Sequence, residues 1–122
     1  YFHTGPHSHG APSQVVLAAQ RHPGTRVILG HCGTTDHAGD MPSILRAHRR
    51  PNLWFELSLV RPWGAGTWVT EETAGRFLWA SGAPRNAMRF ELAQFRKYLP
   101  PARFPDVYGG TLRALLEGVR AC

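Results

Sequence analysis

The chain has 122 residues, which is enough for one small domain and too short for two ordinary ones. Hydrophobic residues make up 43% of the chain and charged residues 18%, a composition that excludes a disordered protein. The longest apolar run, Val15 to Ala19, is far too short to cross a bilayer, so we expect no membrane partner. Because the chain starts at Tyr1 with neither an initiator Met nor an apolar leader, we expect a processed or truncated product.

The formal net charge of +6 raises the question of nucleic-acid binding. The densest basic cluster is Arg46, Arg49 and Arg50, at the end of a predicted helix where positive charge suits the helix dipole. We interpret this cluster as a solvated face and expect no nucleic-acid partner. Cys32 and Cys122 form no disulfide framework and no metal-binding spacing, which predicts a reducing compartment, the cytoplasm.

Short apolar runs alternate with amphipathic segments along the chain, which predicts strands followed by helices. Val27 and Ile28 belong to a run that is apolar on both faces, as expected for a strand buried on both sides of a parallel sheet. Ser13 and Asn86 are predicted to cap two of the helices. The predicted strands cover residues 1–4, 26–31, 52–58 and 76–81. The predicted helices cover about residues 13–22, 42–49, 70–74, 88–99 and 112–119, and residues 61–68 are predicted to form a loop rich in Gly and Trp.

The predicted strands recur about every 25 residues, the spacing of βα units in a barrel or a doubly wound sheet. Four such units make half of a (β/α)8 barrel, which needs roughly 250 residues when complete. We therefore predict an α/β fold of four consecutive βα units, half of a larger barrel. An independent four-stranded α/β sandwich is the alternative.

Polar groups occupy three of the four predicted strand ends: His3, His31 and Ser58. In such folds the carboxyl ends of the strands face one crevice, which carries the chemistry. Two histidines that converge there suit a divalent metal, or a metal together with a general base.

Four segments in order resemble the amidohydrolase-related proteins, a family of metal-dependent hydrolases and decarboxylases that includes the aminocarboxymuconate-semialdehyde decarboxylase type. They are Phe2-His3-Thr4-Gly5, Val27-Ile28-Leu29-Gly30-His31-Cys32-Gly33, Asn52-Leu53-Trp54-Phe55-Glu56-Leu57-Ser58 and Arg76-Phe77-Leu78-Trp79-Ala80-Ser81-Gly82-Ala83-Pro84. The resemblance extends over nearly the whole chain. It implies that residues 1–122 are one partial domain, strands five to eight of a TIM (β/α)8 barrel with their helices.

The resemblance also implies roles for single residues. His3 matches a metal-ligand histidine, with zinc as the expected ion, and His31 matches the histidine that activates the attacking water or acts as acid and base. Gly82 stands where the family has an Asp that binds metal or handles the proton, so the expected ligand is lost at this position. The His-x-His pair of the family's first strand has no counterpart here.

Other polar residues are weaker candidates for the pocket. His7 and His9 form a His-x-His pattern in a loop after Gly5-Pro6, and we interpret them as residues of the pocket rim. Asp36 follows the second strand and offers a replacement carboxylate. Glu56 shares a strand face with Ser58, so it is either paired with an Arg or lines the pocket.

The resemblance implies a metal-dependent hydrolase or a nonoxidative decarboxylase that acts on a small carboxylate-bearing or cyclic substrate. The alternative is a catalytically inactive half-barrel that serves as a binding or assembly module, a hypothesis that Gly82 favours. A half-barrel leaves strand edges open, so the predicted partner is the missing N-terminal half-barrel or a second copy of the chain.

Overall fold

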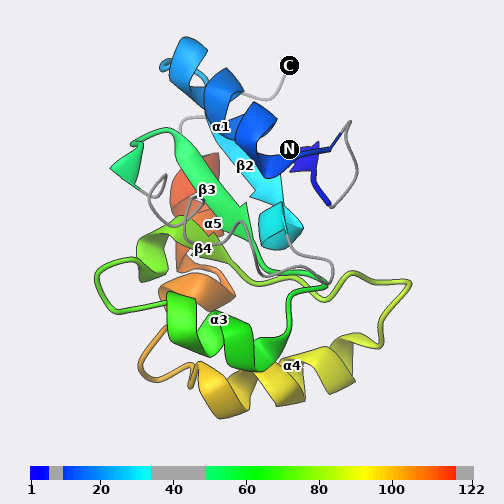
Figure 1. The fold of residues 1–122 in the computed structure, drawn as a ribbon. Helices are drawn as coiled ribbons and strands as arrows, with labels where there is room; N and C mark the ends of the chain where they lie inside the picture. The colour runs from blue at the N-terminus through cyan, green and yellow to red at the C-terminus, as the bar shows by residue number, and fades with distance from the viewer. Residues whose placement is uncertain (6–9, 34–48, 118–122) are drawn as a thin grey trace.

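Four parallel strands form a single sheet at the centre of the molecule (Figure 1). The computed structural model describes residues 1–5, 10–33 and 49–117. The strands follow one another in the order in which they occur in the chain, and each neighbouring pair is parallel. They are β1 (Phe2–His3), β2 (Val27–Gly30), β3 (Leu53–Glu56) and β4 (Phe77–Leu78). Consecutive parallel strands need crossover connections, which is the α/β arrangement that the sequence predicts.

The two faces of the sheet differ in burial. One face carries Leu29, Phe55 and Phe77, which are fully buried in the hydrophobic core. The other face, which we call the open face, carries Tyr1, His3, Ile28, Trp54 and Glu56, and of these only Glu56 is buried. Because Ile28 is only half-buried, the prediction that the second strand is buried on both sides is wrong for the open face.

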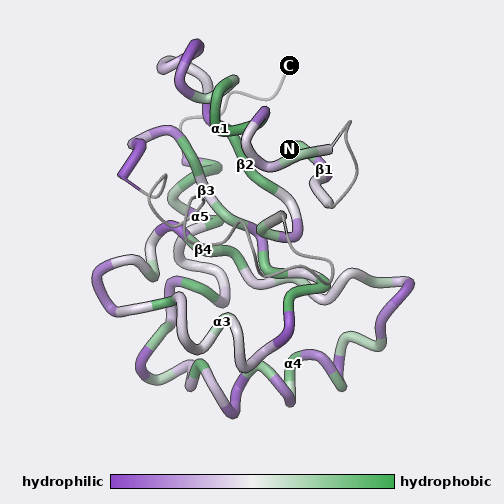
Figure 2. The backbone as a smooth tube through the Cα atoms, viewed as in Figure 1, coloured by the Kyte–Doolittle hydropathy of each residue, from purple (hydrophilic) through white to green (hydrophobic). Residues whose placement is uncertain are grey.

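Helices cover the buried face and one end of the sheet. They are α1 (Pro12–Arg21), α3 (Pro62–Trp68), α4 (Met88–Tyr98) and α5 (Gly110–Leu116), with single 3₁₀ turns η1 (His31–Gly33), η4 (Ala74–Arg76) and η5 (Asp106–Tyr108). α1 lies against β2, and α3 and α4 lie side by side at the other end of the molecule (Figure 1). Figure 2 shows that β2 and β3 are largely hydrophobic, whereas α4 alternates between hydrophobic and hydrophilic residues as a surface helix does.

Several predicted boundaries differ from the structure. α1 begins at Pro12, with Ala11 as its N-cap, so Ser13 does not cap it. α4 likewise has Ala87 rather than Asn86 at its N-cap. Residues 70–74 do not form the predicted helix, and only the 3₁₀ turn η4 begins there, at Ala74. The predicted helix over residues 42–49 falls almost entirely outside the described residues.

The Gly- and Trp-rich segment predicted as a loop is the helix α3. Pro62 occupies its first turn, where the fixed φ of proline favours a helix. A Cβ atom at Gly66 would lie 3.0 Å from Cβ of Tyr98, so the missing side chain lets α3 approach α4 closely. Gly66, which the sequence analysis took as a sign of a loop, is therefore needed for α3 to pack against α4.

Asn52 joins the start of β3 to the end of α1. Its Nδ2 donates to the carbonyl oxygens of Ala19, His22 and Thr25 at 2.9 to 3.0 Å, and the side chain is buried. The side chain of Asn52 thus satisfies backbone carbonyls at the C-terminus of α1 and in the turn that follows it. In the described part of the chain, no helix is long and apolar enough to cross a membrane.

Candidate active site

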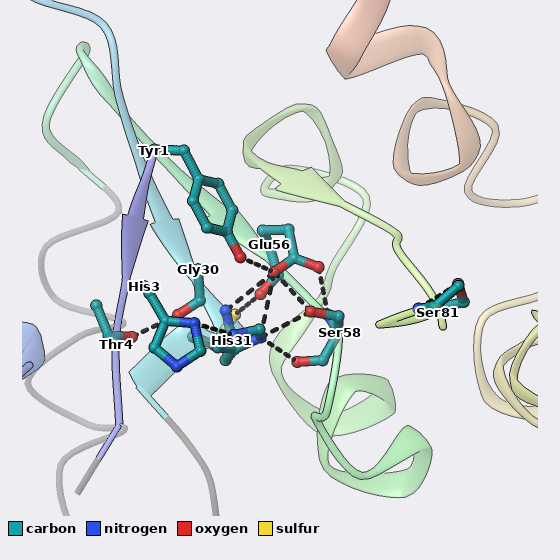
Figure 3. Close-up of polar contacts among 10 residues, drawn as sticks. Tyr1, His3, Thr4, Gly30, His31, Glu56, Ser58 and Ser81 are labelled. Carbon is teal, nitrogen blue, oxygen red and sulfur yellow. Dashed lines mark hydrogen bonds and ion pairs between the residues drawn. The ribbon is translucent and has the colours of Figure 1, made fainter. Parts of the chain in front are cut away.

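A pocket of about 500 Å³ lies where the carboxyl ends of the strands meet, on the open face. Its wall brings together residues from all four βα units, among them five that the sequence singles out: His3, His31, Glu56, Ser58 and Gly82. Figure 3 shows Glu56 between Tyr1 and Ser58, with His31 and His3 beside them. Residues as far apart in the chain as Tyr1 and Arg85 therefore face one cavity, because parallel strands all end at the same edge.

His31 is held from both sides of its ring. It follows β2 directly, in the 3₁₀ turn η1, and its φ of 60° lies in the left-handed region that few residues other than glycine adopt. The side chain is buried, with Nδ1 at 2.7 Å from Oγ and 3.1 Å from the carbonyl oxygen of Ser58. Nε2 lies 2.9 Å from Nδ1 of His3, and the two rings meet edge to face at 80° (Figure 3). Packing and hydrogen bonds thus fix the ring at the pocket wall.

Glu56 is the hub of the polar network. Its buried carboxylate accepts from the backbone N–H of His31 at 3.0 Å and from the backbone N–H of Ser58 at 2.6 Å. It also accepts from the hydroxyls of Ser58 at 2.8 Å and Tyr1 at 3.0 Å. A buried carboxylate is tolerable only with such partners. The sequence left open whether Glu56 pairs with an Arg or lines the pocket. It lines the pocket, and among the described residues no Arg forms an ion pair with it.

Tyr1 completes the wall of the pocket on the β1 side, a role that the sequence analysis missed. Although Tyr1 is 65% exposed, partial burial of its phenol against the pocket wall raises the pKa of Tyr1 to about 12, and the neighbouring Glu56 carboxylate adds to the rise. A Cβ atom at Gly30 would overlap the phenol, so only glycine at this position admits the ring. Tyr1 and His3 are two residues apart on one strand and thus share a face, which is the signal that would have placed Tyr1 in the site.

The fourth strand contributes backbone rather than a functional side chain to the pocket. Gly82 lines the wall with a φ of +71°, and Arg85 follows at the rim with an exposed side chain. Arg85 makes no side-chain hydrogen bond or ion pair with the described residues, so its charge faces the pocket and solvent. The sequence analysis missed Arg85, which follows the last segment that it compared with the family, Arg76 to Pro84.

The described residues do not complete a metal site. In residues 1–5, 10–33 and 49–117 no group of three or more His, Cys, Asp or Glu side chains is placed to hold one ion. His3 and His31 offer two nitrogen ligands, short of the three protein ligands usual in catalytic zinc sites. Their 2.9 Å separation is that of a hydrogen bond, whereas two nitrogens bound to one tetrahedral zinc lie about 3.4 Å apart. His7, His9 and Asp36 lie outside the described residues.

Cys32 behaves as a small buried side chain rather than as a nucleophile. It is fully buried, its Sγ donates to the carbonyl oxygen of Glu56 at 3.4 Å, and burial raises the pKa of its thiol well above the usual range. A thiol that resists ionisation is a poor nucleophile. Trp63 lies apart from the His31 pocket, in a second cavity of about 340 Å³ beside Arg61.

Comparison with known proteins supports the family resemblance that the sequence segments indicate. The family model described as Amidohydrolase matches residues 1–116, nearly the whole chain. No curated protein and no solved structure matches the chain. The family match spans all four strands and the residues of the pocket, and on that match the chain belongs to the amidohydrolase family.

Proposed function

We propose that this chain is part of a hydrolase or nonoxidative decarboxylase in which His31 transfers a proton at a small carboxylate-bearing or cyclic substrate. The observation that carries the proposal is the buried ring of His31. It is fixed at Nδ1 by Ser58, and its Nε2 lies 2.9 Å from Nδ1 of His3 in the wall of a pocket at the carboxyl ends of parallel strands. Proton transfer needs such an oriented group within reach of the substrate.

His31 has the surroundings of a general acid or base. When Nδ1 of His3 withdraws from its 2.9 Å contact with Nε2 of His31, Nε2 can take a proton from an attacking water, as hydrolysis requires. The protonated ring can instead deliver that proton to a substrate carbon after loss of CO₂. When the ring is doubly protonated, the Glu56 carboxylate, 3.5 Å from Nδ1, stabilises the positive charge. The same environment thus serves both reactions, and the choice between them depends on the substrate.

The charges around the pocket favour an anionic substrate. Arg85 at the rim is an exposed cation, and the pocket's carboxylate, Glu56, already has its oxygens engaged by four donors. A guanidinium pairs with a carboxylate through two parallel hydrogen bonds, which would orient an acid substrate. A cavity of about 500 Å³ limits the substrate to a small molecule.

Metal dependence is general in the amidohydrolase family, and we propose His3 as one ligand of a divalent ion, zinc being the expected metal. The described residues do not complete that site, so the mechanism above uses only the side chains of this chain. A third ligand would have to come from residues outside the described ones, where His7, His9 and Asp36 stay candidates. The buried, reduced Cys32 suits a reducing compartment such as the cytoplasm.

A binding or assembly module without catalysis is the second candidate. The observation in its favour is Gly82, which forms part of the pocket wall at the position of the family's Asp and offers no side chain to bind metal or move a proton. Under this hypothesis the pocket binds a small acid without turning it over. A partner, the remaining half-barrel or a second copy, would cover the open face.

Turnover measurements with a matched histidine control distinguish the two candidates. The purified protein, with and without added zinc, is incubated with small aromatic and cyclic acids and their amides, and CO₂ release and hydrolysis are followed. His31→Asn keeps a residue that tolerates positive φ and should lower turnover at least about 100-fold, the usual contribution of a general acid or base. His22→Asn, on an exposed histidine outside the pocket, should leave it unchanged. Binding of these acids without any turnover would favour the inactive module.

A further inference from the structure

Glu56 does more than accept hydrogen bonds from its neighbours in the pocket wall. We propose that Glu56 is a positioning residue that fixes the tautomers of both His31 and His3, through the hydroxyl of Ser58. The inference rests on the proposed role of His31 and concerns which ring nitrogens carry a proton before any substrate arrives. It follows from the direction of each hydrogen bond in a chain of four side chains (Figure 3).

The direction starts at the carboxylate, which can only accept. The hydroxyl of Ser58 has a single proton and donates it to Oε2 of Glu56 at 2.8 Å. The same hydroxyl oxygen lies 2.7 Å from Nδ1 of His31, and without its proton it can only accept there. The carbonyl oxygen of Ser58, at 3.1 Å from Nδ1, is also an acceptor. Nδ1 of His31 must therefore carry the proton, and Nε2 keeps its lone pair in the neutral ring.

The same reasoning extends to His3. Nε2 of His31 accepts in the 2.9 Å contact with Nδ1 of His3, so Nδ1 of His3 must carry a proton as well. The second nitrogen of His3, Nε2, then holds a lone pair. Because His3 is exposed, this lone pair lies at the solvent-facing end of the series of hydrogen bonds. Glu56 thus determines, three hydrogen bonds away, that the pocket presents an acceptor nitrogen at His3.

Glu56 also positions His31 through its backbone. Oε2 accepts from the backbone N–H of His31, whose φ of 60° is unfavourable for a residue with a side chain. The carboxylate holds this conformation in place while it orients the imidazole through Ser58. One buried side chain therefore controls both where the ring lies and which of its nitrogens is protonated.

Nitrogen NMR of ¹⁵N-histidine-labelled protein tests the proposal, because protonated and unprotonated ring nitrogens resonate in separate regions. His31→Asn and His3→Asn identify the signals of the two rings. Spectra are recorded on the protein as isolated and again with a chelator, since a metal on Nε2 would itself impose the Nδ1–H form. We expect both rings to be predominantly Nδ1–H in both samples. A proton on Nε2 of His31, in either sample, overturns the proposal.

Glu56→Leu separates positioning from a merely structural role. Leucine accepts no hydrogen bond, so the hydroxyl of Ser58 is released from position 56 and can donate to Nδ1 of His31. Both histidines should change together, so that Nε2–H becomes the major form of each. Tyr1→Phe removes one hydrogen bond from the same carboxylate and should change neither ring. If the Glu56→Leu protein folds and both rings stay Nδ1–H, Glu56 does not set the tautomers.

Ser58→Ala provides a second variant in case Glu56→Leu does not fold. It removes the nearest acceptor of Nδ1 of His31, at 2.7 Å, so a population of the Nε2–H form should appear. An unchanged single tautomer would show that the hydroxyl relay has no effect and would refute the proposal. These spectra are independent of turnover. A protein with the expected tautomers and no activity would contradict the proposed function alone.

Discussion

Restoring a carboxylate at Gly82 tests whether this position faces the working part of the pocket. The φ of +71° costs a residue with a side chain about 1–2 kcal/mol, and less for Asp or Asn, which adopt this region most readily. A Cβ atom there would lie 3.3 Å from Cδ2 of Leu59, the movable end of a side chain. We therefore expect Gly82→Asp to lower the free energy of unfolding by about 1 kcal/mol and Tm by about 4 °C.

We expect Gly82→Asp to increase the affinity of the pocket for zinc. The new Cβ atom would lie 3.6 Å from Cβ of Ser58, whose hydroxyl contacts His31, so the carboxylate enters the pocket near both histidines. A third protein ligand completes the number usual for catalytic zinc. We expect zinc to bind at least tenfold more tightly, equivalent to about 1.4 kcal/mol.

Gly82→Asn is the matched control, because it has the same shape and the same backbone strain without the charge. Zinc affinity is measured by calorimetric titration of all three proteins, and Tm by thermal unfolding. Equal zinc affinities for the Asp and Asn variants would refute the idea that position 82 is a lost ligand. A loss of stability above about 3 kcal/mol in both variants would show instead that the wall has no room for a side chain.

Three further predictions concern the fold and its charges. Asn52→Ala leaves three carbonyl oxygens at the end of α1 without their buried donor and should lower the unfolding free energy by about 1–3 kcal/mol in urea denaturation, whereas an unchanged midpoint would contradict this role. Because the pKa of Tyr1 is raised to about 12 in the folded state, its contribution to stability is complete below pH 10 and is lost toward pH 12. Wild type should therefore lose stability relative to Tyr1→Phe across that interval, and parallel stability curves would contradict the assigned pKa. Trp54 leaves part of its apolar ring exposed on the open face, so we expect a second copy of the chain to cover that face. The protein should then elute from gel filtration above 13.6 kDa, and a monomeric elution volume would contradict this expectation.

The strands could be predicted from the sequence because each is a short apolar run between turn residues. Leu53 and Phe55 are both fully buried in the core, so the run of apolar residues was enough to predict β3. The helix α3 could not be predicted in this way. Its glycines lower helix propensity, and only the tertiary contact of Gly66 with Tyr98 explains why glycine is present there. The half-barrel stays a prediction, since the described strands form an open sheet.

The candidate site could be predicted as far as strand ends point to a common edge. His3, His31, Glu56 and Ser58 lie together for that reason. Their hydrogen bonds could not be predicted, because they depend on the left-handed conformation of His31, which turns its backbone N–H toward Glu56. No spacing rule in the sequence indicates that conformation for a residue other than glycine.

The buried network bears on whether the pocket is active or serves only to bind. A buried carboxylate with four donors stabilises a fold no better than apolar side chains of similar volume, so stability alone gives no physical reason for Glu56 at this position. Its specific effect is on the protonation pattern of His31, which matters for proton transfer and not for packing. Gly82 offers no carboxylate to the pocket wall, and it leaves the oriented imidazole of His31 unchanged. The two observations agree if the chemistry of this pocket depends on the proton held by His31 rather than on a ligand at position 82.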